Sequence, residues 1–222
     1  MTLKTNTLQN SDFIKLVMMV LVVLEHSIAV TTDDWFHLNL EKNIGLHWVG
    51  WVLDQFHIFV FAMVSGYIFR YLRIERNHYP DFKLFAKKKA ERLLIPLLFV
   101  SLVWTLPINS LYFGSGIKEC LWLLIEGPSQ LWFLYMLFGV YMMAWRFSET
   151  MEKLGLKLLP ILMVFYFIGY YGFTRLPNPL QIWRIFMFSP FFYLGFLFRK
   201  EDADSDEKRG KLRPILVMGG VF

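Results

Sequence analysis

The chain has 222 residues, of which 56% are hydrophobic and 18% are charged, and its formal net charge is +5. A soluble domain of this size has no place for so many apolar side chains, because its outer surface must meet water. The charged residues gather in a few stretches, which argues against nucleic acid as a partner. We predict an all-α, polytopic integral membrane helix bundle that contacts membrane lipids.

Six apolar runs approach the roughly 20 residues with which a helix crosses a bilayer. They cover about residues 13–31, 48–71, 93–112, 131–147, 156–173 and 182–198. The first run has no small-residue cleavage site, so it is predicted to be retained rather than removed as a signal peptide. A shorter apolar stretch at 120–127 is predicted to lie on the membrane surface or to re-enter the membrane.

A seventh apolar run starts at Pro214 and has nine residues before the sequence stops. A helix of that length rises about 13 Å, less than half of the hydrocarbon core. We therefore expect residues 1–222 to form one transmembrane domain of six helices plus the start of a seventh, incomplete at its C-terminus. The polar segment 200–211 is predicted to be a solvated loop between the sixth helix and the start of the seventh.

The distribution of Lys and Arg predicts how the helices are oriented. With the N-terminus inside, all but four of the 23 basic residues fall on the cytoplasmic side. The four exceptions are Lys42, Lys118, Arg175 and Arg184. The sequence thus predicts a multi-pass protein of the plasma (inner) membrane with a cytoplasmic N-terminus.

The first apolar run carries ionisable residues at positions that would share one side of a helix. Lys15 and His26 are eleven residues apart, which leaves them about 20° apart around the axis and about 16 Å apart along it. Asp12 lies one turn before Lys15 on the same stripe, and Glu25 lies a quarter turn to the side. Such groups normally face a bundle interior or a watery cavity. The alternatives are a snorkelling Asp12–Lys15 pair at the interface and a frayed outer helix end at Glu25.

The second apolar run places Asp54, Gln55 and His57 in its outer half, at a depth similar to that of His26. Consecutive helices joined by a short loop usually pack as neighbours, so these side chains are predicted to share one outward-opening cavity. Histidine is suited to act as a general base because its pKa lies near neutrality, and a carboxylate beside it holds its tautomer. No spacing typical of metal ligands is present, so no metal is expected.

Ser65 belongs to a Ser-Gly pair in the same run. It is a candidate substrate-binding residue or nucleophile, although no Gly-x-Ser-x-Gly elbow surrounds it. The alternative is a small-residue notch at which two helices pack closely.

Together these motifs resemble membrane-bound acyltransferase family 3, the glycan O-acyltransferases, and within it the fucose 4-O-acetylase-like branch. In that family the first helix reads Asp-x-x-Arg/Lys, ten residues and His, which matches Asp12, Lys15 and His26. The resemblance extends to four further segments, "FHIFVFAMVSGY" (56–67), "KAERLLIP" (89–96), "SQLWFLYML" (129–137) and "SPFFYLGFLFRK" (189–200). The sequence departs from the family at Glu25, where a small residue is commoner, and in having fewer than the usual ten or so helices.

The resemblance implies transfer of an acyl group, usually acetyl, from cytoplasmic acyl-CoA to a hydroxyl of a cell-surface glycan or lipid-linked sugar. His26 would deprotonate the hydroxyl or carry the acyl group, with Glu25 or Asp54 orienting it and His57 beside it. The donor phosphates would be held by basic residues, namely Lys15, Lys87, Lys88, Lys89 and Arg92. The positive loop 83–92 also has an explanation in membrane topology alone.

Two other functions fit some of these features. A proton-coupled transporter or permease would also carry Asp, Glu and His inside the membrane, but it would often show matched broken helices in inverted repeats. A non-catalytic membrane remnant would explain a short chain. Further helices encoded beyond Phe222 would favour an acyltransferase, and an immediate stop codon would favour a remnant.

Overall fold

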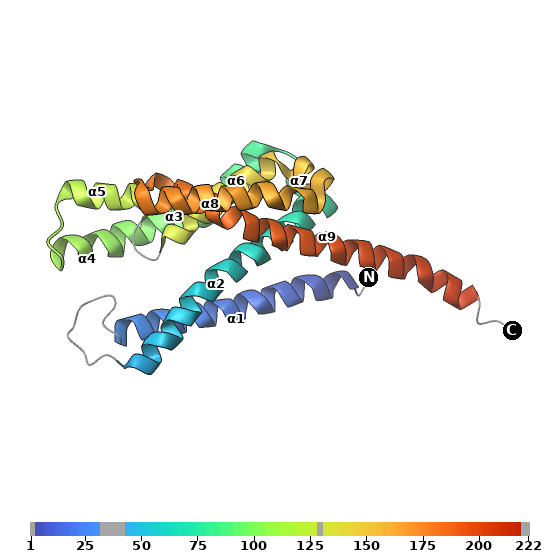
Figure 1. Ribbon diagram of the computed structural model, residues 1–222, viewed down its shortest axis with the longest axis horizontal. Helices are drawn as coiled ribbons and strands as arrows, with labels where there is room; N and C mark the ends of the chain where they lie inside the picture. Colours follow the sequence, from blue (N-terminus) through green and yellow to red (C-terminus); the bar gives the residue numbers. More distant parts are fainter. Residues whose placement is uncertain (1–2, 32–42, 128–130, 219–222) are drawn as a thin grey trace. The chain divides into compact units, whose positions relative to one another are not determined.

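The computed structural model describes the main chain of residues 3–31, 43–127 and 131–218 (Figure 1). Side chains are described in these ranges except at 3–12, 15, 30, 31, 54, 55 and 204–218. Throughout the described ranges the regular structure is helical, which confirms the prediction of an all-α protein. The chain forms two compact units, Met1–Ser65 and Gly66–Phe222.

Helices account for most of the described main chain. In chain order they are α1 (Leu3–Thr31), α2 (Ile44–Arg70), η1 (Tyr71–Glu75), α3 (Phe82–Val100), η2 (Ser101–Thr105), α4 (Leu106–Leu111), α5 (Ile117–Glu126), α6 (Trp132–Arg146), α7 (Ser148–Leu154), η4 (Gly155–Leu158), α8 (Leu159–Arg175), η5 (Pro179–Gln181) and α9 (Ile182–Met218).

Four continuous helical stretches in the described ranges are long and apolar enough to cross a membrane. They are Ile44–Glu75, Phe82–Leu111, Ser148–Arg175 and Pro179–Ala203. Many of their large apolar side chains are exposed, as expected where the surrounding solvent is lipid. These features identify a membrane protein.

The prediction of six membrane-spanning helices and the start of a seventh is therefore not supported, since four such stretches are found in the described ranges. The apolar part of α1 covers only Leu16–Ala29. Helix α6 has 15 residues and rises about 22 Å, short of the roughly 30 Å hydrocarbon core. The run from Pro214 continues α9 instead of starting a new helix.

Two segments that were predicted to be loops are helical. Residues 83–92 belong to α3, whose N-terminus is capped by Asp81: its carboxylate accepts a 2.9 Å hydrogen bond from the Leu84 N–H. Residues 200–211 belong to α9. Both segments are rich in Lys, Arg, Glu and Ala, which favour helix even when they do not favour lipid.

The core of the second unit is aromatic and is built around α9. Helix α9 packs along α8 and against α6, and α6 packs against α3 (Figure 1). The ring centroid of Phe69 lies 5.9 Å from that of Phe85, 6.1 Å from Tyr141, 5.7 Å from Phe192 and 6.4 Å from Phe196. These spacings are typical of well-packed aromatic pairs. The end of α2 and the middle of α9 are thus held together by ring contacts.

Gly66 marks the closest approach of α2 to α9 within this unit. A Cβ atom at residue 66 would lie 1.8 Å from the carbonyl oxygen of Phe192, which is main chain and cannot turn aside. The alternative interpretation of the Ser-Gly pair, a small-residue packing notch, therefore holds for its glycine.

We expect Gly66→Ala to lower the free energy of unfolding by about 3 kcal/mol or more, because the two helices must separate to admit the methyl group. Thermal unfolding of the detergent-purified protein measures this effect. Gly45→Ala is the matched control: its Cβ would lie 3.3 Å from the Asn43 Oδ1, the end of a side chain. A change within about 0.5 kcal/mol is expected for the control. Equal effects at both positions would refute the close packing at Gly66.

Candidate active site

Helix α1 is unbroken over the whole Asp12, Lys15 and His26 motif. This continuity is the condition for the predicted shared stripe, since the spacing places residues on one side only along a regular helix. The side chains of Asp12 and Lys15 lie outside the described residues. Their roles stay predictions.

Glu25 and His26 lie in contact. His26 Nδ1 lies 2.5 Å from Glu25 Oε2 and 2.8 Å from the carbonyl oxygen of Val22. Both oxygens accept hydrogen bonds, so the proton of a neutral imidazole sits on Nδ1 and the lone pair sits on Nε2. The arrangement is that of a base oriented by a carboxylate. Both side chains are partly buried, at 28% exposed for His26 and 13% for Glu25.

His57 has the same tautomer on the neighbouring helix. Its side chain is buried, and Nδ1 lies 2.7 Å from the carbonyl oxygen of Leu53, which again leaves the lone pair on Nε2. Helices α1 and α2 pack closely, because a Cβ atom at Gly50 would lie 2.9 Å from Ile28 Cγ2. The side chains of Asp54 and Gln55 lie outside the described residues.

The remaining candidates occupy other environments. Ser65 is buried in α2, one residue before the close approach at Gly66. Lys89 lies on α3 with its ammonium group 3.6 Å from the ring centroid of Tyr141, a cation–π contact. Arg92 is exposed on the same helix. No group of three or more His, Cys, Asp and Glu in the described part of the chain could hold a metal ion.

The second unit contains an ion-pair cluster that the sequence did not predict, here called the arginine network. It consists of Tyr67, Arg70, Glu75, Glu152, Arg199, Lys200 and Asp202. The Arg70 guanidinium donates to Glu75 Oε1 at 2.8 Å and to both oxygens of Glu152 at 3.1 and 3.2 Å. Arg199 Nε donates to the same Glu75 oxygen at 2.7 Å. Both arginines are about 95% buried, at 5% and 6% exposed.

A sequence signal for this network existed. Arg70 and Arg199 each end an apolar run, where a basic residue is ordinarily assigned to membrane topology. Two acidic residues, Glu75 and Glu152, lie close to the ends of such runs as well. A buried charge needs a partner of opposite charge. The two arginines and two glutamates could therefore have been predicted to form ion pairs.

Three more cations surround Tyr79 and Tyr141 in this unit. Arg73 donates to the Tyr79 carbonyl oxygen at 2.9 Å, and its guanidinium carbon lies 4.7 Å from the Trp145 ring centroid. The Lys88 ammonium group lies 5.7 Å from the Tyr79 ring centroid, and Lys89 lies over Tyr141. The buried Nε–H of Arg73 has no hydrogen-bond partner among the described residues, so it can donate to an added anion.

A polar cluster around Gln181 joins the end of α5 to the turn between α8 and α9. Its amide oxygen accepts from Asn178 Nδ2 at 2.9 Å and from Arg184 Nη1 at 3.1 Å, and its amide nitrogen donates to the Glu126 carbonyl. Leu180 and Gln181 have φ of +52° and +59°, in the left-handed region that few residues other than glycine adopt. These hydrogen bonds hold the strained turn in place.

The helices and the site define a class, a helical membrane protein with a carboxylate-oriented histidine near one end of its first helix. The chain matches the family model described as an acyltransferase domain, of acyltransferase family 3, over residues 8–222. It therefore belongs to this family of membrane acyltransferases, and the predicted resemblance is confirmed at that level. A search of curated proteins found no significant match. A search of solved structures likewise found none.

Proposed function

We propose that this protein is an O-acyltransferase that moves an acetyl group from cytoplasmic acyl-CoA to a hydroxyl of a cell-surface or exported glycan. The proposal joins the family assignment to one observation, the contact of Glu25 Oε2 with His26 Nδ1. That contact favours the tautomer with its proton on Nδ1, so that Nε2 is the basic nitrogen proposed to take a proton from a substrate.

The reaction needs one proton acceptor and one proton donor, and His26 supplies both. Nε2 removes the proton from the sugar hydroxyl while the oxygen attacks the thioester carbonyl carbon. The carbon–sulfur bond then breaks, and the departing coenzyme A thiolate receives the proton from the imidazolium. Glu25 stabilises the imidazolium during the time that it exists. Asp54 and His57 are proposed to position the acceptor hydroxyl from the neighbouring helix.

The donor is proposed to bind through its phosphates to basic residues on the cytoplasmic side. Lys15, Lys89 and Arg92 are the candidates from the sequence, with Asp12 orienting Lys15. Arg73 joins them for two reasons. Its buried Nε–H has no partner among the described residues, and its guanidinium donates to the carbonyl oxygen of Tyr79, a residue whose ring Lys88 also contacts. Charge-assisted hydrogen bonds from such groups are well suited to a diphosphate.

The acceptor is proposed to be a sugar hydroxyl, as in the fucose 4-O-acetylase-like branch, presented on a polysaccharide or a lipid-linked precursor. The orientation that this requires has a cytoplasmic N-terminus in the plasma (inner) membrane. The positive-inside distribution of Lys and Arg supports that orientation. Ser65 is proposed to contact the acceptor.

Mass spectrometry of surface glycans from cells with and without the intact gene tests this function. We expect the glycan of the gene-bearing cells to carry additional alkali-labile groups, each with the mass of one acetyl ester. Returning the gene to cells from which it has been deleted should restore these ester groups. Identical glycans in both cells, together with no transfer of label from acetyl-CoA in isolated membranes, would refute the proposal.

A further inference from the structure

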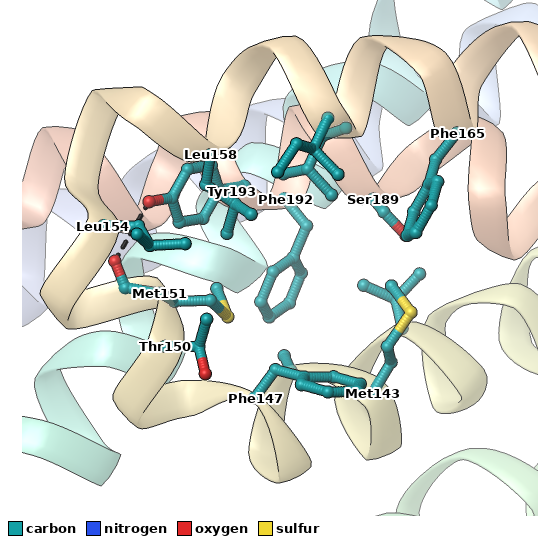
Figure 2. Close-up of a pocket in the computed structure, with 14 residues that line it drawn as sticks. Met143, Phe147, Thr150, Met151, Leu154, Leu158, Phe165, Ser189, Phe192 and Tyr193 are labelled. Atoms are coloured by element: carbon teal, nitrogen blue, oxygen red, sulfur yellow. Dashed lines mark hydrogen bonds between the residues drawn. The ribbon is translucent and has the colours of Figure 1, made fainter.

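An apolar cavity of about 280 Å³ lies inside the second unit, bounded by α6, α7, α8 and α9 (Figure 2). Its inner wall includes the buried side chains of Val140, Met151 and Phe192. Four other lining residues are exposed and mark its mouth, namely Phe147, Thr150, Leu154 and Ile161. The cavity is therefore accessible from outside the bundle and closed at its inner end.

The two buried hydroxyl groups along the wall, those of Tyr193 and Ser189, already donate their protons to the main chain. The Tyr193 hydroxyl donates to the carbonyl oxygens of Met151 at 3.0 Å and Gly155 at 2.7 Å, as Figure 2 shows for Met151. The Ser189 hydroxyl donates to the Ile185 carbonyl at 2.5 Å. A bound water needs two or more polar partners, which these groups do not offer. The cavity is thus suited to an apolar occupant.

Size and position favour a hydrocarbon chain. Apolar cavities of about 150 Å³ take up benzene, so this one holds about ten carbon atoms in proportion. Its mouth lies at the beginning of the Ser148–Arg175 span, where a membrane helix meets the headgroup region. A lipid chain entering there would leave its headgroup at the mouth.

The rim of the mouth is positively charged. Arg146, Lys153 and Lys157 are exposed in the segment that carries the lining residues Phe147 to Leu158. Of the two acidic residues in that segment, Glu152 is engaged by Arg70 and Lys200 in the arginine network. Only Glu149 remains exposed, so the rim complements an anion.

We propose that this cavity is a lipid site, in which one acyl chain of an anionic glycerophospholipid fills the cavity and its phosphate pairs with Lys153 and Lys157. The two parts of the site match the two parts of such a lipid, an apolar pocket for the chain and a cationic rim for the headgroup. The site depends neither on acyl transfer nor on His26. It gives the α7 segment a role as a headgroup-level anchor.

Photolabelling of the full-length protein tests this site. The protein is placed in lipid nanodiscs that contain phosphatidylglycerol with a photoreactive group near the end of one acyl chain, and labelled peptides are mapped. We expect label on α6, α8 or α9 residues of the cavity wall. Thr150→Trp, which blocks the mouth without altering the buried wall, should reduce this label at least about tenfold.

The paired substitution Lys153→Gln with Lys157→Gln should reduce labelling by phosphatidylglycerol about tenfold, because each surface lysine contributes to anionic-lipid binding. Lys118→Gln with Arg175→Gln removes the same charge elsewhere and should have no effect. Unchanged labelling in the Thr150 and lysine variants would overturn the site. Equal labelling by phosphatidylcholine, or displacement by palmitoyl-CoA but not by phosphatidylglycerol, would overturn the anionic-lipid assignment. Thermal unfolding verifies that each variant is folded.

Discussion

Replacing His26 with alanine is expected to lower acyl transfer by at least about 10²–10⁴-fold, the usual contribution of a general base. In the proposed mechanism this imidazole takes the hydroxyl proton and returns it to the thiolate. Its Nδ1 is held by Glu25 and the Val22 carbonyl, so a replacement without a ring nitrogen cannot perform either step. The measurement is transfer of labelled acetyl from acetyl-CoA to glycan in membranes that contain the full-length protein.

The matched control for this substitution is His47→Ala. His47 is also a histidine of the first unit, is exposed on α2 and has no proposed role in the reaction. Full activity is expected in this variant, with the same amount of protein in the membrane as for His26→Ala. Glu25→Gln keeps a hydrogen-bond acceptor but removes the charge that stabilises the imidazolium, so an intermediate loss is expected. Retained transfer in His26→Ala would exclude His26 as the base.

Glu75→Gln is expected to lower the free energy of unfolding by about 3–5 kcal/mol, because the buried Arg199 guanidinium then loses its carboxylate partner, whereas Arg70 keeps Glu152. The carboxylate of Glu75 accepts from both Arg70 and Arg199, which are almost completely buried. In the variant, Arg199 keeps the Tyr67 hydroxyl at 3.3 Å as its remaining hydrogen-bond partner in the network. The measurement is the thermal unfolding midpoint of the purified full-length protein, together with a denaturant titration.

The control for Glu75 is Glu91→Gln, which breaks an exposed ion pair instead of a buried one. Glu91 Oε1 lies 3.9 Å from Lys87 Nζ, and both side chains are more than half exposed. Such a pair contributes less than about 0.5 kcal/mol, so almost no change is expected. Adding Arg199→Gln to Glu75→Gln should recover part of the lost stability, since the unpaired cation is then removed. Equal effects of Glu75→Gln and Glu91→Gln would contradict a structural role for the arginine network.

Contacts made within one turn of helix were predictable. The Glu25–His26 contact follows from their adjacency on α1, and the helical character of α1 and α2 follows from their apolar runs. The prediction that polar segments form loops between the apolar helices was wrong. The polar segments 83–92 and 200–211 are unfavourable in lipid, yet their residues favour helix, so the helices extend past the apolar boundary.

Hydrophobicity and motif spacing were enough to predict an all-helical membrane protein of an acyltransferase family, because both are local properties of the chain. Which distant charges pair, and where the apolar cavity lies, became visible only in the packed helices. Arg199 meets Glu75 across 124 positions, and Tyr193 reaches the carbonyl of Met151 across 42. Such contacts depend on how whole helices pack side by side, and no short segment of sequence carries that information.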